Sequence, residues 1–327
     1  MSRLLGQGEG QTIEVAPTKQ DAASIAECAL GRGVVRVERF TTGSHHFVYD
    51  ITLEDGEHVV ARLSWPSQVE AAQGSVRWSR ALRPIGVPLP KLICADTSKR
   101  DVPFPYVLFE RLPGRDLADE FDNMTREERR VLAFELAEIQ AKVRTLPEGR
   151  GFGYAFTGDP PLKDWQSGVY AGIERSRERI REVGYFEESW ADRVERAARK
   201  FEGYFARIRP VPFLHDITTK NVLIESGKLT GIVDVDSICY GDIVSLIALI
   251  RMALIAHGKD ARYAEDWVDA LALTEEQRGA LSVYVAECCL DFMSEIGQRF
   301  NRDQAPQIDE NYAAHLQSVL EQTLSEI

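Results

Sequence analysis

The chain has 327 residues, of which 44% are hydrophobic and 28% are charged, and this composition is typical of a globular protein and excludes disordered and collagen-like classes. Its length predicts about two domains. Its formal net charge of −12 disfavours a nucleic-acid-binding role, because proteins that bind phosphate backbones usually carry a basic excess.

The five cysteines are odd in number and show neither paired nor zinc-type spacing, which indicates reduced thiols and a cytoplasmic protein. No signal-peptide pattern is visible at the N-terminus. The longest apolar run, residues 243–256, contains Arg251 and is shorter than the roughly 20 residues of a spanning helix. We therefore expect a buried helix there and no membrane segment.

The first hundred residues are rich in strand patterns. Thr18 followed by Asp21 predicts the capped start of a short helix. Apolar residues alternate along 47–53, which predicts a half-buried strand, and the turn at 54–57 predicts a hairpin. The elements expected in this region are strands at 34–40, 47–53, 58–63 and 106–112 and a helix at 68–82.

After Pro113-Gly114 the spacing of apolar residues changes from two to the three and four of a helical face. We therefore predict an α+β fold in which a small antiparallel β-sheet lobe, residues 1–112, precedes a large, mostly helical lobe, residues 113–327. The elements expected in the larger lobe are an isolated hairpin at 222–233 and helices near 132–146, 168–183, 188–208, 242–257, 274–299 and 308–325.

A polar loop that runs directly into an apolar strand carries the strongest chemical signal. Asp216 and Asn221 lie five residues apart in this loop, and Asp234 follows thirteen residues after Asn221 at the far end of the predicted hairpin. Because a hairpin brings its two ends together, Asn221 and Asp234 can share one site, and their oxygen atoms suit Mg²⁺. Asp216 can accept a proton from an attacking hydroxyl group. The alternative is that Asp216 and Asn221 only stabilise a turn.

Several motifs follow one another along the chain. They are Thr42–Tyr49, Val60–Leu63, Gly86–Pro90, Pro105–Gly114, His215-Asp216-x4-Asn221, Ile232–Asp236 and Gly241-Asp242. This set resembles the aminoglycoside phosphotransferase family, whose members are small-molecule kinases with a two-lobed, protein-kinase-like fold. The resemblance implies transfer of the γ-phosphoryl group of ATP, or of GTP, to a hydroxyl group of a small-molecule acceptor. It also implies Asp216 as the catalytic base and Asn221 and Asp234 as Mg²⁺ ligands.

The resemblance further implies a nucleotide site in the smaller lobe. Arg62 is implied to pair with the nucleotide phosphates, and Gly43 and Ser44 to let the backbone approach them closely. Backbone groups from Glu110 to Leu112 are implied to bind the adenine. Considered alone, Arg62 also fits a solvated charge on an exposed edge strand.

Three positions depart from the family pattern. Leu214 stands where the family usually has a His that organises the catalytic loop. Ser75 falls where a Glu is expected to orient the strand cation, and the nearest acid is Glu70. Leu246 occupies a position where relatives often have Asp. These departures keep an alternative function open, namely a non-catalytic relative that binds a nucleotide or another ligand with the same fold.

Acidic residues are concentrated near the C-terminus. Residues 241–327 contain fifteen acidic and six basic side chains, and a cleft lined by one sign of charge attracts the opposite ion. A cationic acceptor, such as an amino sugar or choline, is one expectation; the alternative is that the acids only solubilise exposed helices. The arginine-rich runs at 126–130 and 175–181 are expected to be solvated helix faces. The candidate acids are Glu265, Asp266, Asp269, Glu287, Asp291 and Glu295.

Overall fold

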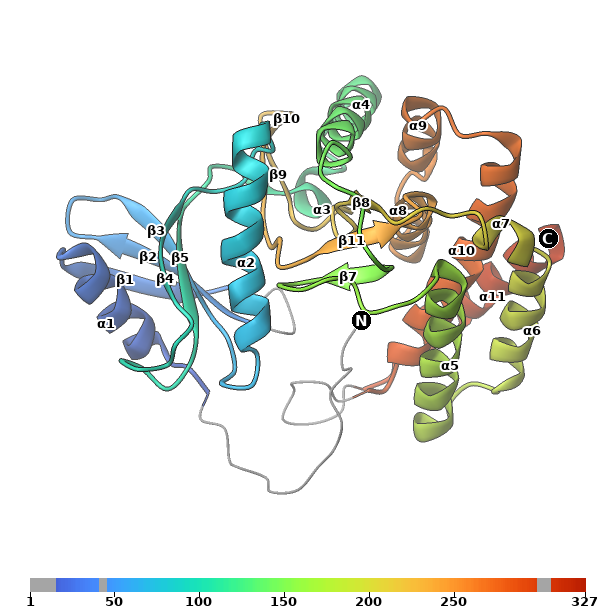
Figure 1. Ribbon diagram of the computed structural model, residues 1–327, viewed down its shortest axis with the longest axis horizontal. Coiled ribbons are helices and arrows are strands. Elements are labelled where there is room, and N and C mark those ends of the chain that lie inside the picture. Colours follow the sequence, from blue (N-terminus) through green and yellow to red (C-terminus); the bar gives the residue numbers. More distant parts are fainter. Residues whose placement is uncertain (1–15, 41–45, 299–306) are drawn as a thin grey trace. The chain divides into compact units, whose positions relative to one another are not determined.

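The computed structural model describes residues 16–40, 46–298 and 307–327, and Figure 1 shows their helices and strands. The chain divides into two compact units. The first consists of Met1–Ala72 and Leu92–Glu110, and the second of Gln73–Lys91 and Arg111–Ile327. Helix α2 (Val69–Leu82) therefore begins in the first unit and continues into the second.

The first unit is built on one five-stranded antiparallel sheet with the strand order β1-β2-β3-β5-β4. Helix α1 (Lys19–Leu30) starts with the predicted capping box of Thr18 and Asp21. The predicted strands are confirmed, whereas β4 is not among them because its five residues show no polar–apolar alternation. The strands are β1 (Val34–Arg39), β2 (Phe47–Leu53), β3 (His58–Leu63), β4 (Leu92–Asp96) and β5 (Tyr106–Glu110).

One face of β2 carries the core of the first unit. Tyr49, Ile51 and Leu53 are buried and alternate with partly exposed residues, as the predicted period of two requires. Ala22 and Ile25 of α1 belong to the same buried cluster. The amphipathic helix thus covers the apolar face of the sheet.

The second unit is mostly helical. The helices predicted in it are confirmed, but one of them is divided, and three further helices are not among those predicted. The segment predicted as one helix at 188–208 is divided into α6 and α7, and α9 is not among the predicted helices because no side-chain cap marks its start. Besides the end of α2, the described helices of the second unit are the short 3₁₀ helix at Arg83–Ile85, α3 (Leu117–Glu120), α4 (Arg126–Val143), α5 (Trp165–Val183), α6 (Ser189–Arg199), α7 (Glu202–Phe205), α8 (Val244–Ala256), α9 (Arg262–Ala270), α10 (Glu275–Glu295) and α11 (Glu310–Glu326).

Two small sheets in the second unit have the strand orders β10-β9-β6 and β7-β11-β8. The predicted hairpin forms from β9 and β10, but the expectation that it stands alone is wrong, because β6 pairs with the other edge of β9. Strand β6 has two residues and is too short to show a period. The strands are β6 (Arg115–Asp116), β7 (Gly153–Ala155), β8 (Val211–Phe213), β9 (Val222–Glu225), β10 (Lys228–Ile232) and β11 (Ile238–Gly241).

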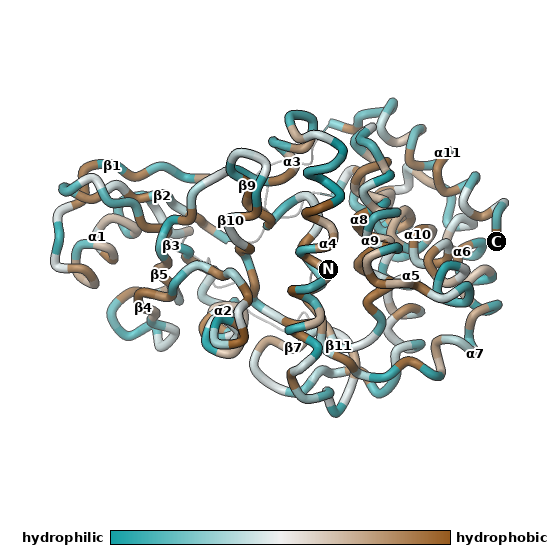
Figure 2. Tube along the Cα trace, turned by 90° about the horizontal axis from the view of Figure 1, so that it is seen from above, coloured by the Kyte–Doolittle hydropathy of each residue, from teal (hydrophilic) through white to brown (hydrophobic). Residues whose placement is uncertain are grey.

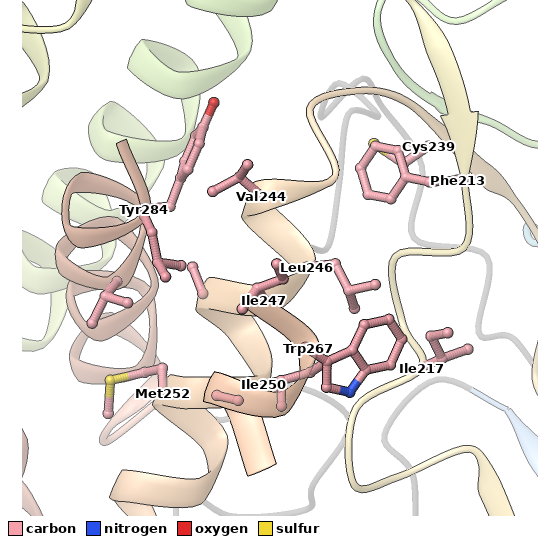
Figure 3. Packing of buried hydrophobic residues seen from close by; sticks show 14 of the residues in the cluster. Phe213, Ile217, Cys239, Val244, Leu246, Ile247, Ile250, Met252, Trp267 and Tyr284 are labelled. Atoms are coloured by element: carbon pink, nitrogen blue, oxygen red, sulfur yellow. The ribbon is translucent and has the colours of Figure 1, made fainter. Parts of the chain in front are cut away.

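Helix α8 is surrounded by the second unit. Figure 2 shows hydrophobic residues along its trace, and its buried side chains come from every face, as predicted for this apolar run. Figure 3 shows Leu246 and Ile250 of α8 packed with Trp267 of α9. The charge within the run, Arg251, lies 3.6 Å from the Glu265 carboxylate. Among the described helices, none is long and apolar enough to cross a membrane.

The arginine-rich run in α5 is not a solvated helix face, contrary to the prediction. The Arg177 side chain is 15% exposed and lies 2.8 Å from Glu195 of α6. The Arg179 side chain is 11% exposed and lies 3.5 Å from Asp291 of α10. These ion pairs join α5 to two helices whose residues are distant in sequence, so the charge pattern of α5 by itself could not indicate them.

Gln140 of α4 is completely buried and holds the backbone of Leu214. Its Nε2 donates to the Leu214 carbonyl at 2.7 Å, and its Oε1 accepts from the Leu214 N–H at 3.0 Å. Both backbone groups are removed from water and need partners. The amide of Gln140 therefore organises the chain where Leu214 itself offers only an apolar side chain.

We expect Gln140→Leu to lower the free energy of unfolding by about 2–4 kcal/mol, because two buried backbone groups lose their partners and each such loss costs about 1–3 kcal/mol. Urea denaturation measures the change. The control is Glu138→Leu at an exposed position of the same helix, which should stay within about 0.5 kcal/mol of the parent. Equal stability of the two variants would contradict this role of Gln140.

Candidate active site

The loop from Leu214 to Asn221 connects β8 to β9 and places polar side chains between buried anchors. Leu214 and Ile217 belong to the hydrophobic core of the second unit, and Figure 3 shows the Ile217 side chain next to the ring of Trp267. Asp216 lies between the two anchors and is exposed. The core packing on either side thus fixes the backbone before and after Asp216.

His215 precedes Asp216 and is held by Tyr154 of β7. The Tyr154 phenol oxygen and the His215 Nδ1 are 2.7 Å apart, and the two rings meet edge to face with centroids 5.3 Å apart. Loss of hydration lowers the pKa of His215 to about 4, so its imidazole is neutral at pH 7. His215, next to Asp216, is therefore held in place by Tyr154 and carries no positive charge at pH 7.

Asn221 at the end of the loop has a left-handed backbone, with φ of 67°, and is held by two hydrogen bonds. Its N–H donates to Asp116 Oδ1 at 3.1 Å, and its Nδ2 donates to the Asp216 carbonyl at 3.0 Å. Because the amide nitrogen faces the Asp216 backbone, Oδ1 is the atom that Asn221 offers to a ligand.

Asp234 lies at the same end of the hairpin as Asn221. Ile232 pairs with Val222 in the ladder, and the next residue, Val233, donates its N–H to the Asn221 carbonyl at 2.9 Å. Asp234 follows directly, is exposed and also has a left-handed backbone, with φ of 63°. The structure thus brings Asn221 and Asp234 to one end of the hairpin, as the hairpin argument predicts, and the hydrogen bond from Asn221 to the Asp216 carbonyl adds Asp216 from the same loop.

The pKa of Asp216 is raised to about 6. The main cause is loss of hydration, because protein surrounds the carboxylate although its outer side is exposed, and the negative charge of Asp234 adds to the effect. The positive charge of Lys220 acts in the opposite direction. Asp216 therefore holds a proton more readily than an ordinary aspartate and is still largely ionised at pH 7.

The donor set fits Mg²⁺ better than a structural metal. Asn221 and Asp234 supply one amide and one carboxylate oxygen, and Mg²⁺ usually takes few protein ligands and completes its shell with water and phosphate oxygens. Across the described ranges, no group of three or more His, Cys, Asp or Glu side chains could hold a metal by itself. A metal ion bound by Asn221 and Asp234 would therefore need further oxygen ligands from water and from a bound phosphate.

Arg62 lies on β3, in the middle of the sheet of the first unit. It pairs with Val48 of β2 on one side and Val107 of β5 on the other, and it is 6% exposed. The alternative interpretation of Arg62 as a solvated charge on an edge strand is therefore wrong. Its role toward phosphates stays a prediction.

Glu110 and Leu112 lie where the chain passes from one unit to the other. Glu110 ends β5 in the first unit, and Leu112 belongs to the second, where its carbonyl accepts from Arg111 Nη1 at 3.0 Å. Their part in binding a base stays a prediction. The two expected phosphate-loop residues, Gly43 and Ser44, lie outside the described residues.

Five of the six candidate acids near the C-terminus form ion pairs, so these five do not make an uncompensated negative surface. Within the described ranges Glu287 is the exception among the six candidates. The five ion pairs are Glu265–Arg251 at 3.6 Å, Asp266–Arg126 at 2.5 Å, Asp269–Arg278 at 3.9 Å, Asp291–Arg175 at 3.1 Å and Glu295–Arg179 at 4.0 Å.

Glu287 of α10 is half-buried against α5. A Cβ added at Gly172 would lie 2.5 Å from Glu287 Oε1, so a larger residue there would require this carboxylate to shift. Burial raises the pKa of Glu287 to about 8, the charge of Asp291 adds to this, and Arg175 opposes it.

Three residues that support the site are absent from the sequence prediction. Asp116, Gln140 and Tyr154 each hold a backbone or side chain of the loop from a different element. Gln140 had a signal, because it is a polar residue on the otherwise apolar face of its helix. Asp116 and Tyr154 lie in strands of two and three residues, where no period can mark them.

The fold is similar to solved aminoglycoside phosphotransferases. A thermostable mutant of APH(4)-Ia in ternary complex with ADP and hygromycin B matches with a TM-score of 0.66 and 16% identity over 93% of this chain and 97% of that chain. The GDP and kanamycin complex of APH(2")-IIIa matches with a TM-score of 0.68 and 14% identity, over 94% and 99% of the two chains. At such identities the likeness shows the fold, and the predicted kinase-like α+β fold is confirmed.

The sequence itself matches a family model. The model described as the phosphotransferase enzyme family matches residues 36–281, which is more than half of the chain. None of the curated proteins matches the chain in sequence. The family match supports a phosphotransferase. The chain belongs to the phosphotransferase enzyme family.

Proposed function

We propose that this chain transfers the γ-phosphoryl group of ATP or GTP to a hydroxyl group of a small molecule. The observation that carries the proposal is the pair of hydrogen bonds at Asn221, whose side chain donates to the Asp216 carbonyl at 3.0 Å and whose carbonyl accepts from Val233 at 2.9 Å. They bring one proton acceptor, Asp216, next to two oxygen donors, Asn221 and Asp234.

In the proposed reaction the acceptor oxygen bonds to the γ-phosphorus, the bond from that phosphorus to the bridging oxygen of the nucleotide breaks, and the hydroxyl proton passes to Asp216. A carboxylate with a pKa of about 6 is ionised at pH 7 and accepts a proton better than an ordinary aspartate. Asn221 and Asp234 would hold Mg²⁺, which supplies charge neutralisation at the phosphates. Positioning of the hydroxyl by the loop completes the contribution of the protein.

The residues proposed to bind the nucleotide are those that the family resemblance implies. Arg62 would pair with its phosphates, and the backbone at Gly43 and Ser44 would approach them. Backbone groups from Glu110 to Leu112 would bind the base. Arg62 is buried on a central strand, and the planar guanidinium group of an arginine matches the geometry of a phosphate, which favours a phosphate partner.

The acceptor is proposed to be a small alcohol, and Glu287 favours a cationic one such as an aminoglycoside or choline. This carboxylate is the one candidate acid without an ion-pair partner in the described residues, and a cation bound beside it would stabilise its ionised form. The relatives crystallised with hygromycin B and kanamycin are consistent with such an acceptor.

Nucleotide consumption in the presence of a panel of cationic and neutral alcohols tests the proposed function. We expect ATP or GTP consumption that depends on both Mg²⁺ and one class of alcohol. Nucleotide binding without turnover on any alcohol, and without dependence on Mg²⁺, would instead support the non-catalytic alternative.

We also propose that the protein acts in the cytoplasm, where its thiols stay reduced.

Asp216→Asn removes the proton acceptor and keeps the size of the side chain. We expect turnover to fall by about 10²–10⁴, the usual contribution of a general base, with little change in nucleotide affinity. In the parent, kcat/KM for the nucleotide should fall as the pH drops below about 6, where Asp216 becomes protonated. Near-normal turnover of the variant on a working acceptor excludes Asp216 as the base.

Asp234→Ala and Asn221→Ala should weaken the Mg²⁺-dependent part of nucleotide binding to different extents. Loss of the Asp234 carboxylate removes a charged ligand and should abolish the dependence, whereas loss of the Asn221 amide removes a neutral one and should only reduce it. Calorimetric titration with nucleotide, with and without Mg²⁺, separates the two results. If both variants keep the Mg²⁺ dependence of the parent, the metal assignment fails.

Glu287 should make the binding of a cationic acceptor depend on pH. Because its pKa is about 8 in the free protein, binding at lower pH must release a proton, and affinity should rise by up to about tenfold per pH unit toward pH 8. Choline is a suitable probe because its charge does not titrate.

Calorimetry of the parent, of Glu287→Gln and of Asp269→Asn measures this effect. The pH dependence should disappear in Glu287→Gln and persist in the control Asp269→Asn, whose carboxylate forms a surface pair with Arg278 at 3.9 Å. A parent that prefers neutral alcohols, or an unchanged pH dependence in Glu287→Gln, rejects Glu287 as a cation site and leaves the proposed phosphoryl transfer intact.

A further inference from the structure

Helix α2 is attached to the segment that follows Asp234. The Ser75 hydroxyl, 2% exposed, donates to Asp236 Oδ1 at 2.8 Å. Both residues belong to the second unit, since the part of α2 from Gln73 onward lies in it. This part-buried hydrogen bond ends on a carboxylate, and such a bond is stronger than one between neutral groups. Asp236 is two residues beyond Asp234.

Gly74 brings the helix backbone directly onto the same segment. A Cβ added at Gly74 would lie 2.0 Å from the Asp236 carbonyl oxygen and 3.3 Å from the Phe156 Cα. Both neighbours are backbone atoms, which cannot move aside as a flexible side chain can. The contact between α2 and Asp236 thus involves both a side-chain hydrogen bond and a backbone approach that only glycine permits.

Asp234 needs such support because its backbone is in the left-handed region, with φ of 63°. A non-glycine residue stays in this conformation only when its surroundings hold it there. The hydrogen bond from Val233 to Asn221 holds the side that precedes Asp234. The contacts of Ser75 and Gly74 hold the side that follows it.

We propose that Ser75 is a positioning residue for Asp234: by holding Asp236, its hydroxyl keeps the Asp234 carboxylate aimed at the site it shares with Asn221. Ser75 occupies the position where the family pattern places a Glu that orients the strand cation. In this chain the residue at that position instead supports the proposed metal ligand Asp234. The inference rests on the proposed role of Asp234 as a Mg²⁺ ligand. It means that α2 helps to hold the segment from Asp234 to Asp236 in place.

Helix α2 offers a matched control one turn further on. Ser79 is also buried, at 4% exposure, but its hydroxyl has no hydrogen-bond partner in the described part of the chain. Ser75→Ala and Ser79→Ala therefore remove the same atom from the same helix at similar burial, and only the first removes a contact to Asp236. General effects of the substitution on the helix appear in both variants.

The experiment has two readouts. In the absence of ligand, amide hydrogen exchange of the peptide covering residues 233–238 should be about tenfold faster in Ser75→Ala than in Ser79→Ala, the effect of losing one hydrogen bond to a charged group. In nucleotide titrations, the Mg²⁺ concentration for half-maximal binding should rise about tenfold in Ser75→Ala, because residues that orient a metal ligand typically change affinity by at least this factor. Ser79→Ala should match the parent in both.

Each outcome decides one of the two claims. Equal exchange and equal Mg²⁺ dependence in the two serine variants overturn the positioning role of Ser75 and leave the proposed function standing. Faster exchange in Ser75→Ala with a parent that shows no Mg²⁺ dependence rejects Asp234 as a metal ligand, and with it the positioning role. Gly74→Ala should produce a larger loss of Mg²⁺ affinity than Ser75→Ala; an unchanged affinity in a folded Gly74→Ala protein also overturns the inference.

Discussion

The hydrogen bond from the Asn221 amide to the Asp216 carbonyl, 3.0 Å long, is the contact on which the candidate site depends. It spans the polar loop, so the loop cannot change length or direction without breaking it. It also determines which atom of Asn221 is offered to a ligand. Asn221 also accepts a hydrogen bond from the Val233 N–H, so this one residue links the backbone at Asp216 to the backbone just before Asp234.

Two carboxylates held near each other raise the energy of their own ionised state. The pKa of Asp216 is raised because burial and the charge of Asp234 both disfavour a second negative charge, and Lys220 compensates only in part. A cation between the two groups would relieve this cost. The Mg²⁺ proposed to bind Asn221 and Asp234 would be such a cation.

The hydrophobic core makes this arrangement rigid. Leu214 and Ile217 are buried on either side of Asp216, and Leu246, where relatives often have Asp, is fully buried in α8. The departure at Leu246 is thus a core position in this chain and does not bear on the proposed chemistry. At Leu214, which departs from the family pattern, the backbone is held by the side-chain amide of Gln140 of α4.

Much of the fold could be predicted because its signals are local. The alternation along β2, the capping box at Thr18 and the apolar run of α8 each depend on neighbours within a few residues, and all three are confirmed. Very short strands such as β6 and β7 could not be predicted, since two or three residues carry no period.

The sequence by itself determined the two-part α+β architecture, the family and the spacing that brings Asn221 and Asp234 to one end of a hairpin, because each is encoded in consecutive residues. Only the tertiary structure decided which acids are compensated, that Arg62 lies buried on a central strand, and that Ser75 faces Asp236. These facts depend on partners that lie far away in sequence, such as Ser75 and Asp236, which are 161 residues apart. Hydrogen bonds and ion pairs form between whichever groups the packing of the core brings into contact.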